Sequence, residues 1–239
     1  MKIEHLLITR FSYRNYTNGN GRSPQYDSDP LDPEKLEFRF LIFEMICLPN
    51  ILAQVNKDFT WVFIIDEHLA QEYRDKLFEL TKSLKNVYLY EFKNEDQFSL
   101  DCFKDYFSAD ADYVITTNID DDDALPVYYI QDMHDHVMES YKLKNLAPLK
   151  ILAATRFCQW DLVHKKKTPL GTISPWHRKK GVCSCGFSLL VKFPEYNFNV
   201  WGIEHGDAGR YLNFNNPSDR TAIRKANNIF KLAVEKNDP

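Results

Sequence analysis

Residues 113–125 read Tyr-Val-Ile-Thr-Thr-Asn-Ile-Asp-Asp-Asp-Asp-Ala-Leu, an apolar, β-branched run that ends in four consecutive carboxylates. Such a run predicts a buried strand. The four acids that follow repel one another, and a divalent cation would relieve that repulsion because hard cations take carboxylate oxygens. If the extended conformation continues through the acids, Asp120 and Asp122 point to one side, and Asp121 and Asp123 to the other. The stretch therefore predicts a D-x-D arrangement at the carboxyl end of a strand, where open α/β sheets bind ligands.

Strands and helices are predicted to alternate through the first half of the chain. Apolar runs predict strands at 3–9, 61–65, 87–92 and 113–119, and helical spacing predicts helices at 33–47, 51–55, 69–84, 100–107 and from Pro126 to 141. This alternation favours a mostly parallel, Rossmann-like sheet flanked by helices. The second half predicts strands at 150–155, 159–163 and 186–193 and a closing helix at 218–234. We expect one domain, 1–239, with a nucleotide-binding half (1–125) and an acceptor-side half (126–239).

Composition excludes several classes of protein. The chain has 239 residues, of which 44% are apolar and 27% charged, as is usual for a globular protein. The net charge of −4 gives no basic field for nucleic acid. Five irregularly spaced cysteines favour a reducing compartment. Residues 1–10 lack the long apolar run that is typical of a signal peptide, and the apolar runs elsewhere are too short to span a bilayer. We therefore expect a cytoplasmic protein with no transmembrane segment and no nucleic-acid partner, and peripheral contact with the inner face of the membrane stays open.

Three common sources of acidic clusters fail on spacing. An EF-hand loop that begins at Asp120 needs glycine and glutamate where the chain has Leu125 and Gln131. An aspartyl-phosphate phosphatase has D-x-D-x-T after its first strand, whereas here the fifth position is Ala124 and the strand is the fourth. The chain also lacks a P-loop and a G-x-G-x-x-G motif. A D-x-D that follows the fourth strand of an α/β half-domain remains.

This D-x-D resembles the motif with which GT-A glycosyltransferases hold Mn²⁺ or Mg²⁺ against the diphosphate of a nucleotide sugar. Further segments occur in the order found in the putative rhamnosyltransferase family of bacterial GT-A enzymes: Leu7–Phe11, Arg39 with Phe43-Glu44, Leu48-Pro49 with Ala53-Gln54, Phe59–Trp61 and Thr116–Leu125. The resemblance covers about the first half of the chain. It implies a GT-A fold, a nucleotide-diphospho sugar donor, and a glycan or lipid-linked saccharide acceptor in polysaccharide biosynthesis. It implies sugar transfer more firmly than it implies rhamnose.

The resemblance also assigns roles within the acidic run. Asp122 would ligate the metal directly, and Asp120 would reach the ribose or a metal-bound water. Asp123 would contact the donor sugar, or else only cap the helix that Pro126 opens. Asp121 is expected to be a solvated charge.

Two further segments leave strands at the same edge of the predicted sheet. Thr9 and Arg10 end the first strand where GT-A folds hold the nucleotide, and the planar guanidinium of Arg10 could bind phosphate. An ion pair of Arg10 with a nearby carboxylate is an equal alternative. Asp66 ends the second strand, where GT-A folds commonly meet the base, and its alternative role is a cap for the following helix.

A late constellation, Trp201-Gly202-Ile203-Glu204-His205-Gly206-Asp207, places an acid and a histidine between glycines. By the resemblance, His205 would complete the metal shell. An inverting transfer needs a carboxylate base for the acceptor hydroxyl, and both Glu204 and Asp207 qualify. A polar surface loop is the alternative interpretation.

Two basic runs, 164–167 and 177–180, bracket residues 168–176. They are interpreted as a solvated loop or as a mobile lid over an anionic ligand. We interpret the whole chain as a metal-dependent, inverting glycosyltransferase. Two alternatives stay open: a metal-dependent nucleotidyltransferase or phosphohydrolase, and a non-catalytic module that binds a cation or glycan.

Overall fold

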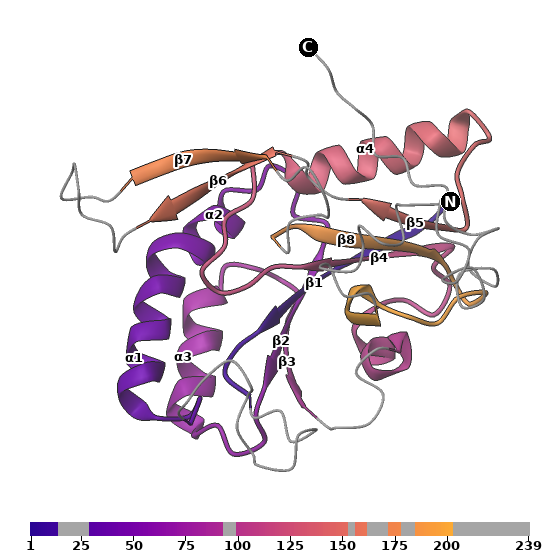
Figure 1. Cartoon of the computed structure of the whole chain (residues 1–239). Helices are drawn as coiled ribbons and strands as arrows, with labels where there is room; N and C mark the ends of the chain where they lie inside the picture. Colours follow the sequence, from indigo (N-terminus) through magenta and orange to yellow (C-terminus); the bar gives the residue numbers. More distant parts are fainter. Residues whose placement is uncertain (14–28, 93–98, 153–155, 162–171, 178–184, 203–239) are drawn as a thin grey trace, which may run out of the picture.

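The computed structural model describes residues 1–13, 29–92, 99–152, 156–161, 172–177 and 185–202. A six-stranded sheet runs through the centre in the order β3-β2-β1-β4-β8-β5 (Figure 1). The strands in this order are β3 (Val87–Glu91), β2 (Thr60–Ile65), β1 (Ile3–Arg10), β4 (Tyr113–Asn118), β8 (Phe187–Lys192) and β5 (Leu149–Leu152). A separate pair is formed by β6 (Arg156–Asp161) and β7 (Thr172–His177).

The first four strands of the chain are parallel. Ile8 of β1 lies opposite Val62 of β2 and Asn118 of β4, and β2 pairs with β3 in the same sense. The strand β8 is antiparallel to both β4 and β5. The predicted α/β class with a mostly parallel, helix-flanked sheet is confirmed, and it is consistent with a GT-A fold.

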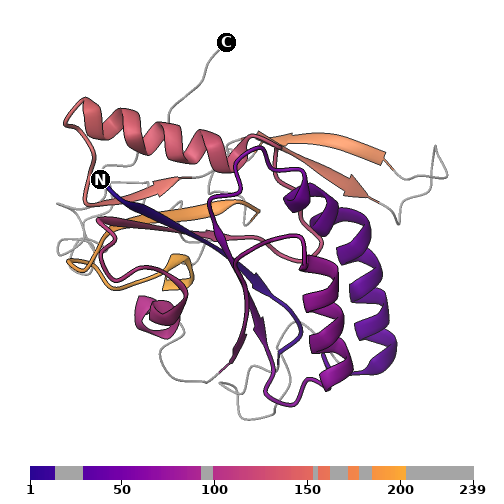
Figure 2. The same ribbon diagram turned by 180° about the vertical axis from the view of Figure 1, so that it is seen from behind.

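Helices lie on both faces of the sheet (Figure 2). The helix α1 (Pro33–Ile42) begins where predicted, because the carboxylate of Asp32 accepts the backbone N–H groups of Glu34 and Lys35. It continues through a π-helical turn, η2 (Phe43–Cys47), into α2 (Leu48–Leu52). The remaining helical elements are α3 (Gln71–Thr81), η3 (Leu100–Tyr106), α4 (Tyr129–Lys142) and η4 (Val200–Gly202).

The alternation of side chains along β1 divides the core between the two faces of the sheet. Leu7 joins the cluster beneath α1, α2 and α3, which is rich in aromatic rings. Leu6 and Ile8 join the cluster beneath η3 and η4. Ile115 and Leu190 pack against α4 in a third cluster. Because the sheet is covered on both faces, its strands are nearly continuous apolar runs, as their sequences predict.

Some predicted boundaries are wrong, for local reasons. Pro126 does not open α4; it precedes the helix, and its carbonyl accepts the backbone N–H of Tyr129 at 2.8 Å. Residues 172–177, predicted as part of a loop or lid, form β7 and pair with β6. The predicted helix at 218–234 lies outside the described residues. Among the described helices, none combines the length and the apolar character needed to cross a membrane.

Candidate functional site

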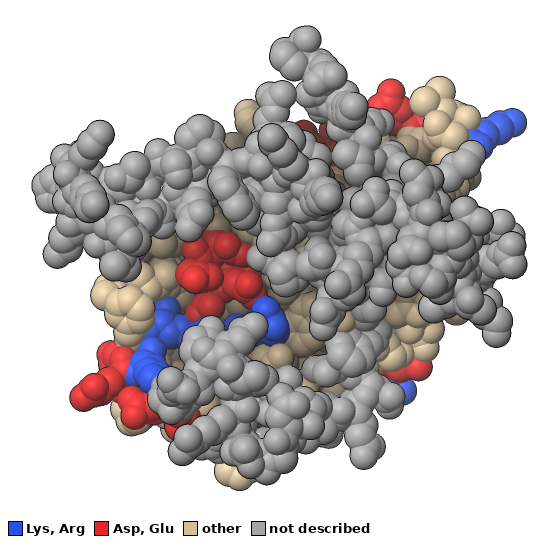
Figure 3. Space-filling view, in the orientation of Figure 1, with Lys and Arg blue, Asp and Glu red and all other residues tan. Residues whose placement is uncertain are grey.

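The sheet extends from β1 in both directions, and the chain switches from one side of β1 to the other after β3. From β1 the chain adds β2 and β3 on one side, and then crosses to the other side to form β4. The carboxyl ends of β1 and β4 therefore border a topological switch point, where open α/β sheets bind ligands. Arg10 ends β1, and the four acids follow β4. Figure 3 shows acidic side chains gathered on this face with basic side chains beside them.

The four acids form a tight turn, which we call the acidic turn (Asp120–Asp123). The backbone N–H of Asp123 donates to the carbonyl of Asp120 at 3.1 Å, and the side chain of Asp123 accepts the N–H of Asp120 at 3.3 Å. The extended conformation thus ends with the strand, and the predicted alternation of the four side chains is wrong. The turn gives each carboxylate its own surroundings.

Asp121 points inward and is not the solvated charge that the sequence predicts. It is 7% exposed, and Nη1 of Arg39 donates to both of its carboxylate oxygens at 2.8 Å. Burial raises the pKa of Asp121 to about 6, although Arg39 opposes the shift and repulsion from Asp122 adds to it. The ion pair joins α1 to the acidic turn across 82 residues of sequence.

Asp123 does not cap α4; it closes the acidic turn. Burial, followed by repulsion from Asp120 and Asp122, raises the pKa of Asp123 to about 7. A side-chain hydrogen bond links Asp123 with Cys185, whose thiol also lies 3.4 Å from the carbonyl of Ala124. The negative charge of Asp123 is therefore disfavoured by its surroundings, and a bound proton or cation would relieve the repulsion.

Arg10 faces the acidic turn from the end of β1. Its Nη2 lies 3.4 Å from the carboxylate of Asp120, so the ion pair foreseen as one alternative is present. Its guanidinium also lies over the ring of Trp201 at 5.7 Å and makes a side-chain hydrogen bond with Tyr13. Burial lowers the pKa of Arg10, but Asp120 and Tyr13 outweigh this effect and the pKa is raised. Arg10 therefore keeps its positive charge opposite the acids.

Thr9 and Asp66 take other positions. Thr9 is fully buried on the face opposite Arg10, and its hydroxyl accepts the indole N–H of Trp61 at 2.9 Å. The structure thus does not bring Thr9 together with Arg10. Asp66 is also buried, and its carboxylate accepts the N–H of His68 at 2.9 Å. Asp66 therefore shapes the turn that precedes α3. The N-cap position of α3 is occupied by Ala70 and not by Asp66.

The late constellation is described only up to Gly202. Glu204, His205 and Asp207 lie outside the described residues, as do the basic runs 164–167 and 178–180. Trp201 belongs to η4, and its indole N–H donates to the side-chain oxygen of Asn118 at 2.9 Å. Trp201 thus connects η4 to Asn118, the last residue of β4, which only Ile119 separates from the acidic turn.

The described carboxylates fit a hard cation that binds together with a ligand. Within the described ranges, no three histidine, cysteine, aspartate or glutamate side chains are arranged to hold one metal ion. Asp120 and the exposed Asp122 offer oxygen donors, and Mg²⁺ characteristically takes one or two carboxylates and completes its shell with waters and substrate phosphates. A cation would also relieve the repulsion that acts on Asp123. The donor set therefore suits Mg²⁺ or Mn²⁺.

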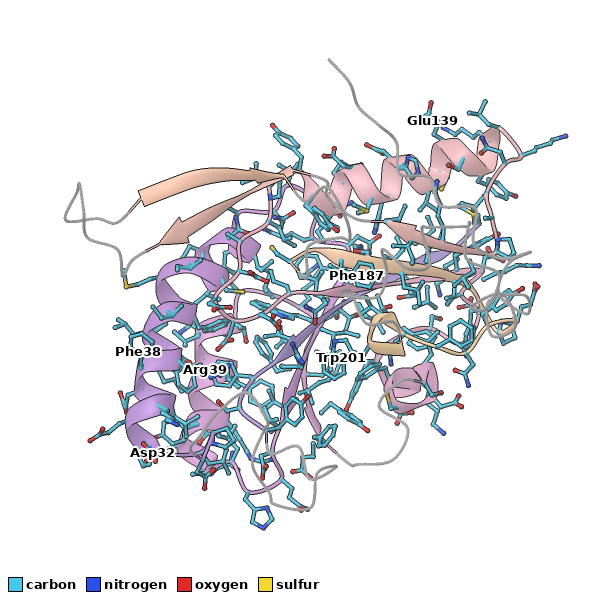
Figure 4. All side chains as sticks on the ribbon, viewed as in Figure 1. Asp32, Phe38, Arg39, Glu139, Phe187 and Trp201 are labelled. Carbon is cyan, nitrogen blue, oxygen red and sulfur yellow. The ribbon has the colours of Figure 1, made fainter. Side chains whose placement is uncertain are left out.

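Three polar side chains that hold the loop behind the acidic turn have roles that the sequence does not predict. Arg39 binds Asp121; Asn50 exchanges hydrogen bonds with the backbone of Leu125; and Gln54 donates to the carbonyl of Pro126 at 2.8 Å. Figure 4 shows Arg39 on α1 and Trp201 on η4, so the site is approached from both faces of the sheet. No local sequence pattern predicts these pairings, because each joins segments more than 70 residues apart.

The fold and this geometry define an α/β protein whose acidic turn lies at the switch point of its sheet. The profile of the family described as "Putative rhamnosyl transferase" matches residues 4–229. The chain therefore belongs to this family.

Solved structures give distant likenesses. The crystal structure of S. aureus TarS 1–349 is similar at 13% identity and a TM-score of 0.36, covering 63% of this chain and 35% of that one. The apo structure of mouse xyloside xylosyltransferase 1 is similar at 12% identity and a TM-score of 0.36, covering 88% of this chain and 71% of that one. The chain thus spans about a third of the TarS chain. No curated protein matches it.

Proposed function

We propose that the protein is a glycosyltransferase that moves a sugar, with rhamnose as the first candidate, from a nucleotide-diphospho sugar to a hydroxyl of a glycan or lipid-linked saccharide, in polysaccharide biosynthesis and with Mn²⁺ or Mg²⁺. The observation that carries the proposal is the acidic turn facing Arg10 across the switch point. Carboxylates alone would repel a diphosphate. Carboxylates that together bind a divalent cation, next to the guanidinium of Arg10, would bind a diphosphate.

The residues would divide the work of donor binding. Asp122 is exposed and offers an oxygen ligand, and Asp120 would offer a second one once Arg10 turns to the phosphates. The Arg10–Asp120 distance of 3.4 Å is long for a charge-assisted hydrogen bond, so breaking this contact would cost little free energy. Arg10 would then stabilise the charge that develops on the departing nucleoside diphosphate. The bound cation would supply Lewis-acid stabilisation of the same leaving group.

The acceptor side of the proposal rests on the late constellation. If the donor is dTDP-L-rhamnose, a direct inverting displacement is expected, and it needs one carboxylate as base. Glu204 and Asp207 are the proposed bases, and His205 is a proposed further metal ligand. Glu204→Gln and Asp207→Asn are assayed separately. The substitution that abolishes turnover but keeps donor binding identifies which of the two residues is the base.

Calorimetric titration tests the donor site. UDP, dTDP and GDP are titrated into wild-type protein and Asp122→Asn, with Mn²⁺ and with EDTA. The proposal expects Mn²⁺-dependent binding of one nucleotide, weakened about 10- to 100-fold in Asp122→Asn. The matched control Asp112→Asn changes another exposed carboxylate, one that contacts the chain's amino terminus, and should bind as wild type does. Metal-independent binding, or equal affinity in wild type and Asp122→Asn, would contradict the proposed site.

A product assay separates the chemistry from its alternatives. Incubation with the nucleotide sugar that binds should release the nucleoside diphosphate. Release of pyrophosphate or nucleoside monophosphate would point to a nucleotidyltransferase or phosphohydrolase. Binding of Mn²⁺ without any nucleotide would point to a non-catalytic cation-binding module.

A further inference from the structure

Three polar side chains from the α1–α2 segment, Arg39, Asn50 and Gln54, hold the chain between β4 and α4, and we call them the loop clamp. Asn50 donates to the carbonyl of Leu125 at 2.5 Å and accepts its N–H at 2.6 Å. Gln54 donates to the carbonyl of Pro126 and accepts the N–H of Ile130 at 3.2 Å. These side chains satisfy backbone groups that would otherwise be left without partners where the loop is buried.

Arg39 completes the clamp at the acidic turn itself. Its side chain is 25% exposed, and that of Asp121 is 9% exposed, so the ion pair is largely withdrawn from water. A guanidinium in this position draws the second residue of the turn inward. The third residue, Asp122, consequently faces solvent, while Asp120 stays within reach of Arg10.

We infer that the loop clamp positions the acidic turn for donor binding, with Arg39 holding Asp121 so that Asp122 stays turned toward the ligand. These three are positioning residues, since they contact the turn and its loop, and the inferred ligand contacts belong to Asp120 and Asp122. The inference rests on the proposed function for its ligand, and on the geometry alone for its effect on the turn. Groups that orient metal-ligating side chains commonly change affinity or activity by about 10- to 100-fold when removed.

A set of variants separates positioning from mere stability. Arg39→Met leaves the buried Asp121 carboxylate without its partner and should lower both the urea midpoint and the affinity for the Mn²⁺–nucleotide complex. Arg39→Met/Asp121→Asn removes the stranded charge and should recover the urea midpoint. Its affinity should nevertheless stay about 10- to 100-fold below wild type, because the turn is no longer tethered. Recovery of wild-type affinity together with stability would overturn the inference.

Three further variants sharpen the comparison. Asn50→Ala loosens the loop without changing charge and should weaken nucleotide binding in the same way. Arg39→Lys keeps a cation near Asp121 but loses the planar guanidinium that contacts both carboxylate oxygens, so it should recover only part of the affinity that Arg39→Met loses. Lys76→Met is the matched control: it breaks the 2.9 Å ion pair with Glu44 on the same helical segment and should leave binding unchanged. Unchanged binding in Arg39→Met and Asn50→Ala would also overturn the inference.

Hydrogen–deuterium exchange supplies a readout that needs no ligand. Backbone amides of residues 119–128 should exchange faster in Arg39→Met and Asn50→Ala than in wild type, and not in Lys76→Met. If wild-type protein binds no nucleotide, the proposed function fails, and the exchange data alone decide whether the clamp holds the turn. If nucleotide binds and exchange in this segment is the same in all variants, the inference fails and the proposed function stands.

Discussion

The buried His5–His134 pair predicts how stability depends on pH. His5 of β1 is 2% exposed, its Nδ1 lies 3.2 Å from Nε2 of His134, and its Nε2 lies 2.7 Å from the hydroxyl of Thr117. Burial, followed by repulsion from His134, holds the pKa of His5 well below the ordinary 6.5. Burial also lowers the pKa of His134. The native state therefore keeps His5 neutral at a pH where the unfolded chain protonates it.

The size of the effect follows from proton linkage. The unfolded state binds one more proton than the native state below pH 6.5, so the stability is present above that pH and is lost as the pH falls. For one histidine that stays neutral when folded, the free energy of unfolding falls by about 1.4 kcal/mol between pH 7.5 and 5.5. Asp123, whose pKa is raised to about 7, acts in the opposite direction. The total pH dependence of wild-type protein thus hides the histidine contribution, and a variant is needed to isolate it.

The assay is urea unfolding of wild-type protein, His5→Gln and Phe38→Ala at pH 7.5 and 5.5, followed by tryptophan fluorescence. His5→Gln removes the titrating group, so the stability lost on substitution should be about 1.4 kcal/mol smaller at pH 5.5 than at pH 7.5. Phe38→Ala on the exposed side of α1 changes no titrating group and is the control, so its cost should be the same at both values of pH. An equal cost of His5→Gln at both would refute the linkage argument.

Three further substitutions test the core and the acidic turn. Phe43→Ala, which removes a fully buried ring between α1 and the sheet, should cost about 3–5 kcal/mol in urea unfolding, whereas Phe38→Ala on the exposed side of α1 should stay within about 0.5 kcal/mol. Trp61→Phe removes the donor to the buried hydroxyl of Thr9 and should cost about 1–3 kcal/mol, and a neutral result would show that this hydrogen bond contributes little. Asp123→Asn keeps an oxygen that can accept the turn hydrogen bond but removes a crowded charge, so it should stabilise the protein by about 1 kcal/mol more at pH 8.5 than at pH 6, and a gain independent of pH would contradict the raised pKa.

The strands of the large sheet could be predicted because each is buried on both faces and therefore appears as an apolar run. β2, Thr60–Ile65, is buried at every position, and α1 begins at the predicted capping residue Asp32. β7 was missed because the segment 172–177 contains Pro175 and lies beside a basic run, both of which are typical of a loop. Its pairing with β6 decides its conformation, and that pairing is a long-range property.

The acidic turn shows where reasoning from the sequence stops. The residue types, their place after the fourth parallel strand and the nearness of Arg10 were all predictable, since the carboxyl ends of parallel strands meet at one edge. The orientation of each carboxylate was not, because it depends on Arg39, which lies 82 residues away. A period of two applies only while the chain is extended, and here the chain turns directly after the strand.

The distribution of charge explains why a run of four acids can be stable before any ligand binds. Arg39 neutralises Asp121, and Arg10 lies beside Asp120. The raised pKa of Asp123 lets a proton occupy that carboxyl near neutral pH. Of the four acids, only Asp122 is exposed. Under the proposed function, two of these three compensations, the proton and the Arg10 contact, would be replaced by a cation and a diphosphate at modest cost, because one is a titration near pH 7 and the other is a long ion pair. The third, the buried Arg39–Asp121 pair, cannot be exchanged without stranding a charge. We therefore propose that the Arg39–Asp121 pair stays in place when the donor binds, while the proton on Asp123 and the Arg10–Asp120 contact are replaced.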